Sequence, residues 1–210
     1  MLLTYYRGNE TFASSNDSGI GHCLAFQRQI SRFIKNAICG GFLVVFLCSF
    51  SLRSFAEGFV AFVPHATYQV CFTPGGQCTA AIVKVIDDAK QQILVQAFNF
   101  TSKKIAHALV RAKRRGVEVK ILLDKSIVDN DFMLTFIKLH HLWFKIDVLP
   151  VVAHNKVMVV DNHMVITGSF NFTVAAETSN AENVLIIDDY NLAQQYAKNW
   201  YQREKKAIND

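Results

Sequence analysis

Proline, glycine and cysteine are all scarce in this chain, and each shortage excludes a class of protein. The 3 Pro and 10 Gly among 210 residues are too few for a collagen-like or low-complexity chain. Hydrophobic residues make up 51% of the sequence, which separates it from disordered proteins. The 5 Cys are too scattered for a disulfide-built miniprotein or for the two close ligand pairs of a structural zinc module. We therefore expect an ordinary domain with a hydrophobic core, and neither a metal nor another cofactor.

Excess charge is also small. The formal net charge is +5, from 22 Lys and Arg against 17 Asp and Glu. Residues 1–56 contain five of the basic and two of the acidic residues, so the remainder carries 17 against 15, or +2. Charge alone therefore does not indicate a nucleic-acid-binding protein.

The N-terminal segment has the three parts of a secretory signal. Basic residues come first, an apolar run from Ile38 to Phe50 follows, and Ser54-Phe55-Ala56 forms a small-x-small cleavage site. We expect residues 1–56 to be a leader with a signal peptide, and residues 57–210 to be an exported domain, periplasmic or secreted. The alternative is an uncleaved inner-membrane anchor, because the stretch 36–52 is free of charge and 17 residues long, near the lower limit for spanning a bilayer.

Export leaves only Cys71 and Cys78 in the mature chain. The turn-forming sequence Pro74-Gly75-Gly76 lies between them and can bring their side chains together. In an oxidising compartment we expect the two to form a disulfide; two free buried thiols are the alternative.

The sequence from Tyr68 onward alternates between strand-like and helix-like periods with short connections, which predicts one α/β domain. Helices are expected from a Thr79 cap to about Ala89, from Thr101-Ser102 to Gly116, over 131–140, and over a closing stretch that carries Leu192, Tyr196 and Trp200. Strands are expected at 68–72, 93–99, 117–124, 143–148, as a pair within 155–167, and at 183–188.

The pair of strands within 155–167 carries the informative polar residues. Residues two apart on a strand share a face, so His154 projects with Lys156, and Ser169 with Asn171. A two-residue turn at Asn162-His163 would place Lys156 opposite Ser169 and His154 opposite Asn171. An imidazole, an ammonium, a hydroxyl and an amide gathered in this way supply a nucleophile or base and donors for anionic oxygens, as phosphoryl transfer requires. Solvated groups at a sheet edge are the alternative.

These residues carry a family resemblance. His154, Lys156, Asp161, Gly168, Ser169 and Asn171 follow the pattern His-x-Lys-x4-Asp-x6-Gly-Ser-x-Asn. The pattern resembles the signature of the phospholipase D superfamily, in its small bacterial endonuclease-like branch with one motif per chain. The similarity extends from about Val70 to Trp200, with a departure between Ile127 and Trp143.

The resemblance implies a phospholipase D-like fold, a mixed sheet flanked by helices, and a two-step phosphodiesterase mechanism without metal. His154 would attack phosphorus to form a phosphohistidine, and a second histidine would protonate the leaving oxygen. Because the chain has one motif, the resemblance implies a homodimer in which two copies of His154 share one site.

The resemblance also implies roles for the neighbouring residues. Lys156 and Asn171 would hold phosphate oxygens with Ser169 alongside, and Glu182 would orient the histidine ring; an exposed carboxylate at a strand start is the alternative for Glu182. Asp161 and Gly168 are expected to be structural members of the motif.

The expected substrate follows from the branch that the sequence resembles. The leading hypothesis is a nonspecific endonuclease acting on DNA or RNA, and the alternative is a phospholipase D acting on membrane phospholipids such as phosphatidylcholine or cardiolipin. The basic run Arg111 to Arg115, with nearby lysines, could guide a polyanion, but cations also complement the end of a helix, and we favour that interpretation.

Overall fold

The computed structural model describes residues 58–129, 131–148 and 151–209. The expected leader, residues 1–56, and the alternative membrane anchor, 36–52, lie outside these residues. Within the described part of the chain, no helix is both long and apolar enough to span a bilayer.

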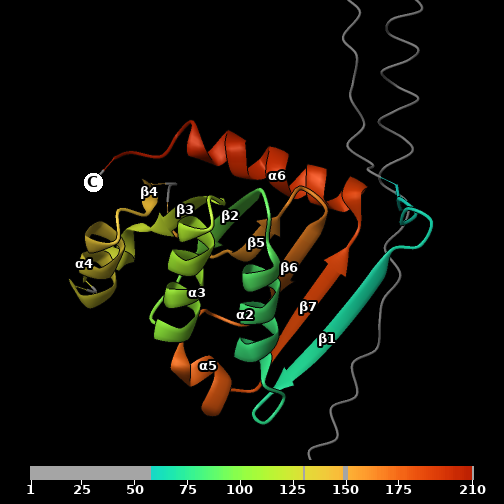
Figure 1. The fold of residues 1–210 in the computed structure, drawn as a ribbon, viewed down its shortest axis with the longest axis horizontal. Helices are drawn as coiled ribbons and strands as arrows, with labels where there is room; N and C mark the ends of the chain where they lie inside the picture. Colours follow the sequence, from blue (N-terminus) through green and yellow to red (C-terminus); the bar gives the residue numbers. More distant parts are fainter. Residues whose placement is uncertain (1–57, 130, 149–150, 210) are drawn as a thin grey trace, which may run out of the picture. The chain divides into compact units, whose positions relative to one another are not determined.

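One seven-stranded mixed sheet forms the centre of the domain (Figure 1). Its spatial order is β1-β7-β6-β5-β2-β3-β4, with β2, β3 and β4 parallel to one another and every other neighbouring pair antiparallel. The strands are β1 (Thr67–Thr73), β2 (Gln92–Ala97), β3 (Glu118–Asp124), β4 (Trp143–Asp147), β5 (Lys156–Val160), β6 (Met164–Gly168) and β7 (Glu182–Asp188). The expectation of an α/β domain with a mixed sheet flanked by helices is confirmed.

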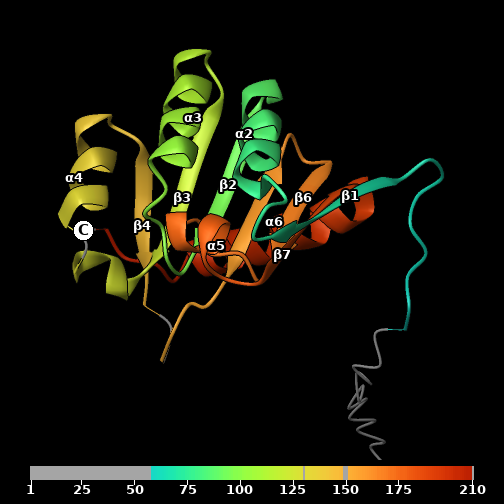
Figure 2. The same ribbon diagram turned by 90° about the horizontal axis from the view of Figure 1, so that it is seen from below.

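Helices cover the two faces of the sheet unequally. The helices are α2 (Cys78–Asp88), α3 (Lys103–Arg114), the 3-10 helix η1 (Lys125–Asp129), α4 (Asp131–Leu139), α5 (Val174–Thr178) and α6 (Tyr190–Glu204). Helices α2, α3 and α4 lie on one face, as Figure 2 shows, and bury the larger core with residues such as Ile82, Leu109 and Ile137. The second core lies under α6, where Trp200 packs on the opposite face with Leu94 and Val159.

Local sequence signals explain most helix ends. The Ser102 hydroxyl accepts a hydrogen bond from the backbone N–H of Ile105 at the start of α3, and Gly116 follows its end with φ 90°. Thr79 does not cap α2, contrary to expectation, because the helix begins one residue earlier at Cys78. The cap comes from a distant residue instead, since the Glu177 carboxylate accepts from the Thr79 backbone N–H at 2.6 Å.

Cys71 and Cys78 form a disulfide between β1 and α2, as the sequence predicts. Cys71 and Cys78 are bonded, with their Cα atoms 5.6 Å apart. Gly76 lies in the closed loop, where a Cβ would stand 1.9 Å from the Phe72 carbonyl oxygen, so only glycine fits this turn. The bond fastens the last residues of β1 to the first turn of the helix that follows.

Candidate active site

His154 and Lys156 lie together at the edge of the sheet where β5 begins. The Nζ of Lys156 is 3.2 Å from each ring nitrogen of His154 and also donates to the His154 carbonyl oxygen at 3.2 Å. Phe98, just beyond the end of β2, supports both: its ring centroid is 4.5 Å from that of His154 and 5.1 Å from Nζ. The imidazole is exposed and the ammonium is buried beneath it.

The position of Lys156 in the sheet explains its burial. All five residues of β5 are buried, because this strand lies between β2 and β6 in the middle of the sheet. Only 8% of Lys156 is exposed, and this burial lowers the pKa of its ammonium, while the charge of Glu182 acts in the opposite direction. A partly desolvated ammonium beside an imidazole is placed to bind an anionic oxygen.

Ser169 and Glu182 form a second polar group at the same edge. The Ser169 hydroxyl donates to the Glu182 carboxylate at 2.5 Å, and the same carboxylate accepts from the side-chain amide of Asn180 at 2.9 Å. These two hydrogen bonds lower the pKa of Glu182, with a further contribution from the charge of Lys156. Asn183 donates to the Ser169 hydroxyl from its backbone N–H at 3.1 Å and from its side chain at 3.3 Å.

The expected ring-orienting role of Glu182 stays a prediction. Among the described residues of one chain, the carboxylate has Ser169 and Asn180 as its hydrogen-bond partners and reaches Lys156 only through its charge. The His154 ring contacts Lys156 and Phe98 instead.

The expected register of the hairpin is wrong by one residue. Val160 pairs with Met164 and Met158 with Ile166, so the turn contains three residues, Asp161 to His163. Asp161 and Asn162 both adopt positive φ, 50° and 60°, so Asp161 belongs to the turn and not to β5. Continuing this register places Lys156 opposite Gly168 rather than Ser169.

Gly168 is required by its surroundings. Its φ is 145°, and a Cβ there would lie 2.2 Å from the backbone oxygen of Asn183. Any larger residue would push β6 and β7 apart at the point where Ser169 begins its contacts with Glu182 and Asn183. Only glycine fits at this position, directly before Ser169.

Asn171 lies beside the start of α3 and carries an unused acceptor. Its side-chain oxygen is buried without a hydrogen-bond partner within the described ranges. The next residue, Phe172, fixes this segment by accepting from the backbone N–H groups of Thr101 and Ser102 at 2.9 and 2.8 Å. The expected role of Asn171 as a phosphate donor stays a prediction.

Asp161 lies at the far end of β5, and its side chain is hydrogen-bonded to the backbone of a distant segment. Its carboxylate accepts from the backbone N–H groups of Lys90, Gln91 and Gln92 at 2.8, 2.7 and 3.0 Å. Burial alone would raise the pKa of Asp161, but these backbone hydrogen bonds outweigh it and the pKa is lowered. Asp161 thus joins the hairpin turn to the chain just before β2.

Asp124 positions the nucleophile segment, and sequence reasoning missed it. Its buried carboxylate accepts from the backbone N–H of Ala153 at 2.6 Å and from that of Ser126 at 2.9 Å. A signal was present, because an acidic residue at the carboxyl end of a buried strand, Val119 to Leu123, seldom stays buried without a partner.

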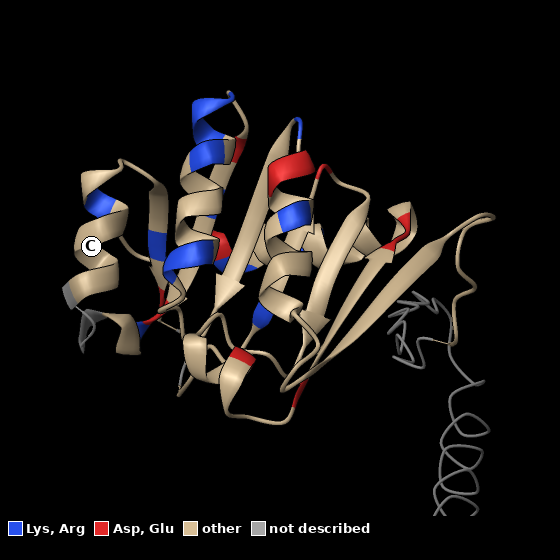
Figure 3. Cartoon of the chain, turned by 60° about the horizontal axis from the view of Figure 1, so that its bottom comes forward, with Lys and Arg blue, Asp and Glu red and all other residues tan. Residues whose placement is uncertain are grey.

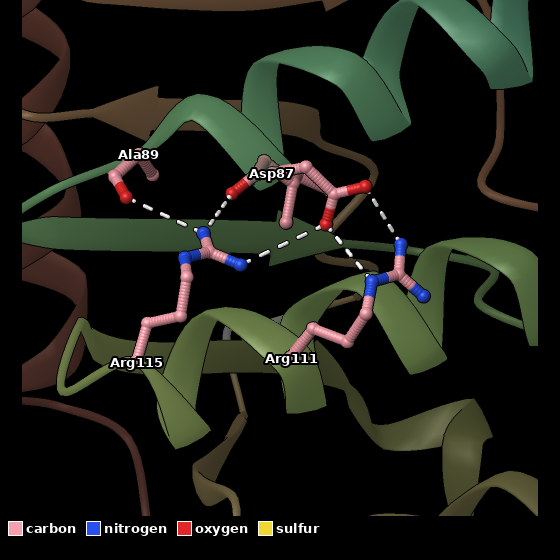
Figure 4. Close-up of polar contacts among 5 residues, drawn as sticks. Asp87, Ala89, Arg111 and Arg115 are labelled. Atoms are coloured by element: carbon pink, nitrogen blue, oxygen red, sulfur yellow. Dashed lines mark hydrogen bonds and ion pairs between the residues drawn. The ribbon is translucent and has the colours of Figure 1, made fainter.

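The basic run at the end of α3 is largely paired with acidic side chains and backbone carbonyl oxygens. Figure 3 shows Lys and Arg at this end of α3 beside acidic residues of α2. Arg111 makes a two-point contact with Asp87, at 3.0 and 2.8 Å, and Arg115 donates to the Ile86 and Ala89 carbonyl oxygens, at 2.8 and 3.3 Å (Figure 4). Lys113 donates to two backbone carbonyl oxygens, those of His140 and His141.

The run also lies at the wrong end of the sheet for a role at His154. Arg115 contacts Ala89, which precedes β2, whereas Lys156 pairs with Ala97 at the other end of that strand. Six residues of strand separate the two ends by about 17–20 Å.

The described residues also contain no group of three or more His, Cys, Asp or Glu side chains that could hold a metal ion. The site that remains is an exposed imidazole over a buried ammonium, with a hydroxyl and a carboxylate nearby. These groups can attack an electrophilic phosphorus and hold its oxygens.

Comparisons with known proteins agree with this chemistry. Residues 82–203, more than half of the chain, match the family model described as "Cardiolipin synthase, PLD-like domain". A protein named phospholipase D from Rickettsia prowazekii is 40% identical over 159 residues, which cover 74% of this chain and 78% of that protein. A mitochondrial cardiolipin hydrolase from Xenopus laevis is 32% identical over 153 residues, covering 65% of this chain and 70% of the relative.

A solved structure gives the same assignment. The crystal structure of a phospholipase D family member, Nuc from Salmonella typhimurium, superposes with a TM-score of 0.66 at 36% identity, covering 69% of this chain and 98% of Nuc. The imidazole–ammonium pair at the start of β5, the mixed sheet that carries it and these similarities lead to one conclusion: the chain belongs to the phospholipase D superfamily and is a phosphodiesterase of that superfamily.

Proposed function

We propose that this phosphodiesterase hydrolyses membrane phospholipids through a phosphohistidine on His154. The observation that carries the mechanism is the exposed imidazole with the buried Nζ of Lys156 3.2 Å away. A ring nitrogen of His154 attacks phosphorus, the bond from phosphorus to the leaving oxygen breaks, and Lys156 binds a non-bridging oxygen. A water molecule then attacks phosphorus, the bond to nitrogen breaks and His154 is regenerated.

The proposed catalytic unit is a homodimer, because the mechanism needs a second acid and base. The sequence has one His-x-Lys motif, and a histidine bonded to phosphorus cannot also protonate the leaving oxygen. The partner subunit's His154 supplies that proton and later takes one from the attacking water. Mixing His154→Ala subunits with wild-type subunits should then inactivate the mixed dimers, whereas half activity in mixed dimers would contradict a shared site.

Two features support a lipid substrate over the nucleic acid that we expected first. The cations at the end of α3 are bound to Asp87 and to carbonyl oxygens, at the end of the sheet away from His154. Apolar side chains instead flank the nucleophile: Val151 and Val152 are exposed directly before Ala153 and His154. Exposed valines beside a reactive group are suited to the boundary of headgroups and acyl chains.

Nucleic acid remains a second candidate because of Lys103 and Lys104. Both are exposed at the start of α3 and line a hollow of about 300 Å³ with Thr101 and Ser102. The backbone N–H groups of Thr101 and Ser102 donate hydrogen bonds to the carbonyl oxygen of Phe172, which follows Asn171. The hollow and its two lysines therefore lie near the site. Phosphate binding by such lysines would weaken steeply with salt.

A substrate panel in EDTA tests the proposal. We expect purified protein to release headgroups from phosphatidylcholine or cardiolipin vesicles faster than it cleaves plasmid DNA or RNA. Val151→Asp should slow vesicle hydrolysis and leave a small soluble phosphodiester unaffected, while Leu139→Asp, an exposed apolar position on α4, should change neither. Cleavage of DNA or RNA with intact vesicles would overturn the lipid assignment, and loss of all activity in EDTA would overturn the metal-independent mechanism.

Export completes the proposal. The disulfide between Cys71 and Cys78 supports an oxidising compartment, since such bonds persist outside the cytosol. We place the catalytic domain in the periplasm or outside the cell, with attachment to the inner membrane through residues 36–52 as the alternative.

A further inference from the structure

Thr73, the last residue of β1, has a hydroxyl that bonds the chain on both sides of Ala181. Its Oγ1 donates to the backbone carbonyl oxygen of Asn180 at 3.1 Å and accepts from the backbone N–H of Glu182 at 3.1 Å. Only 6% of Thr73 is exposed, whereas Phe72, on the other face of the strand, is 63% exposed. The buried hydroxyl therefore fixes the bend that leads from α5 into β7.

The same bend carries the carboxylate of the candidate active site. Thr73 and Glu182 lie directly opposite each other in the pairing of β1 with β7. One carboxylate oxygen of Glu182 accepts from the Asn180 side chain at 2.9 Å, and the other accepts from the Ser169 hydroxyl. Because Thr73 bonds the backbone of both Asn180 and Glu182, it sets where this carboxylate stands relative to Ser169.

The chain on either side of Thr73 restrains it. The disulfide between Cys71 and Cys78 closes the loop that contains Thr73. Just beyond this loop, the Thr79 backbone N–H donates to the Glu177 carboxylate on α5 at 2.6 Å. The connection from β1 to α2 thus holds the connection from α5 to β7 at two points, one near each cysteine.

Glu182 also acts on Lys156 through its charge. Burial lowers the pKa of the Lys156 ammonium, and the negative charge of Glu182 raises it. The imidazole of His154 is a second titratable group beside the ammonium. The residues that flank Lys156 on β2 and β6, Ala97 and Gly168, carry no charge. The place of the Glu182 carboxylate therefore affects how firmly Lys156 keeps its proton.

We propose that Thr73 is a positioning residue of the active site, an inference that rests on the proposed function, in which Lys156 binds a phosphate oxygen. The Thr73 hydroxyl holds the Glu182 carboxylate against Ser169, where its charge acts on Lys156. Valine has nearly the shape of threonine and is equally favoured in strands, so packing at the end of β1 does not require the hydroxyl. The bend that presents Glu182 does require it.

Thr73→Val removes the hydroxyl, and Thr73→Ser restores it. With a soluble phosphodiester, kcat should fall about tenfold in Thr73→Val with little change in KM, and should return to within about twofold of wild type in Thr73→Ser. The alkaline limb of the pH profile should move to lower pH in Thr73→Val, because the pKa of Lys156 falls when Glu182 loses its fixed place. Thr67→Val makes the same substitution at the other end of β1 and should change none of these quantities.

Two further measurements separate positioning from a loss of folding, which circular dichroism monitors. In a Glu182→Gln background, Thr73→Val should not move the pH profile further, because the charge is already absent. NMR of isotope-labelled lysine side chains follows the pKa of Lys156 without turnover, through the signal that is missing from Lys156→Met. If Thr73→Val does not fold, Asn180→Ala breaks an exposed bond to Glu182 and should lower the same pKa. An unchanged pKa there would overturn the proposal.

The remaining outcomes distinguish this inference from the proposed function. Wild-type kcat and an unchanged pKa of Lys156 in folded Thr73→Val would overturn the inference. An equal effect in the Glu182→Gln background would also overturn it and would assign Thr73 to stability alone. A lowered pKa of Lys156 in Thr73→Val, in a protein that hydrolyses none of the substrates, would leave the positioning intact and overturn the proposed function.

Discussion

The Asp124 carboxylate accepts a hydrogen bond from the backbone N–H of Ala153, the residue directly before His154. Asp124 is the last residue of β3, so the contact ties the nucleophile segment to a strand that does not itself enter the site. Burial alone would raise the pKa of Asp124, but hydrogen bonds from Ser126 and Ala153 outweigh it and the pKa is lowered. The lowered pKa keeps this carboxylate ionised beneath the segment that carries His154.

Asp124→Asn should lower kcat for the soluble phosphodiester about tenfold with little change in KM. The amide can keep only one of the two acceptor oxygens, so the Ala153 segment loosens and the imidazole is less often aligned with phosphorus. Steady-state kinetics measure kcat and KM separately. Asp87→Asn, which loses the ion pair with Arg111, is the matched control and should keep wild-type kcat. A rise in KM at constant kcat would contradict positioning.

His154→Ala should reduce phosphodiester hydrolysis by about 10⁴-fold or more, because it removes the nucleophile and, in the proposed dimer, the acid as well. Turnover is measured on protein whose folding is checked by circular dichroism. His163→Ala is the control, since His163 lies in the hairpin turn and contacts Asp188 at 2.9 Å. Substantial turnover by folded His154→Ala would exclude the phosphohistidine mechanism.

Asp161→Asn should destabilise the domain by about 1–2 kcal/mol at neutral pH, because the carboxylate accepts three backbone hydrogen bonds. The pKa of Asp161 is lowered in the folded state, so its contribution is present above the ordinary carboxyl pKa and is lost as the pH falls through the folded pKa. Urea unfolding should show the gap between wild type and variant closing below about pH 4.

The control for this measurement is Asp88→Asn, which loses only an exposed pair with Lys84. It should leave the urea midpoint near that of wild type. A gap for Asp161→Asn that stays constant down to pH 2 would show that the charge of the carboxylate is not what stabilises the turn.

Reduction of the Cys71–Cys78 bond should lower the free energy of unfolding by about 2–3 kcal/mol, as expected for a short closed loop. Urea unfolding with and without dithiothreitol measures the change, and we expect the reduced domain to remain folded. Mass spectrometry of the exported protein should find the two cysteines joined. Two unmodified thiols there would count against both the bond and the compartment.

Sequence patterns predicted the strands and helices well, because burial follows hydrophobic periodicity. Ser102 marks the start of α3 and Gly116 its end, through contacts within a few residues. The local sequence was therefore sufficient to predict both ends of this helix. The α2 cap could not be predicted in this way, because it comes from Glu177, nearly a hundred residues along the chain.

The same limit explains the error in the hairpin register. Asn162 tolerates positive φ in any context, but Asp161 adopts it where its side chain binds the backbone of Lys90 to Gln92. Those partners lie about seventy residues away, so the sequence could suggest a two-residue turn and not a three-residue one. The pairing of His154 with Lys156 survived the error, because it depends only on alternation along one strand.

The spacing of the signature is a measure of strand length. His154 and Asp161 lie just outside the two ends of β5, so the seven-residue interval between them spans the full length of this strand. One end presents the imidazole to solvent, and the other is bonded to the chain ahead of β2. Inserting or deleting a single residue between Lys156 and Asp161 would move His154 and Lys156 together to the opposite face of the sheet, the side that α6 covers.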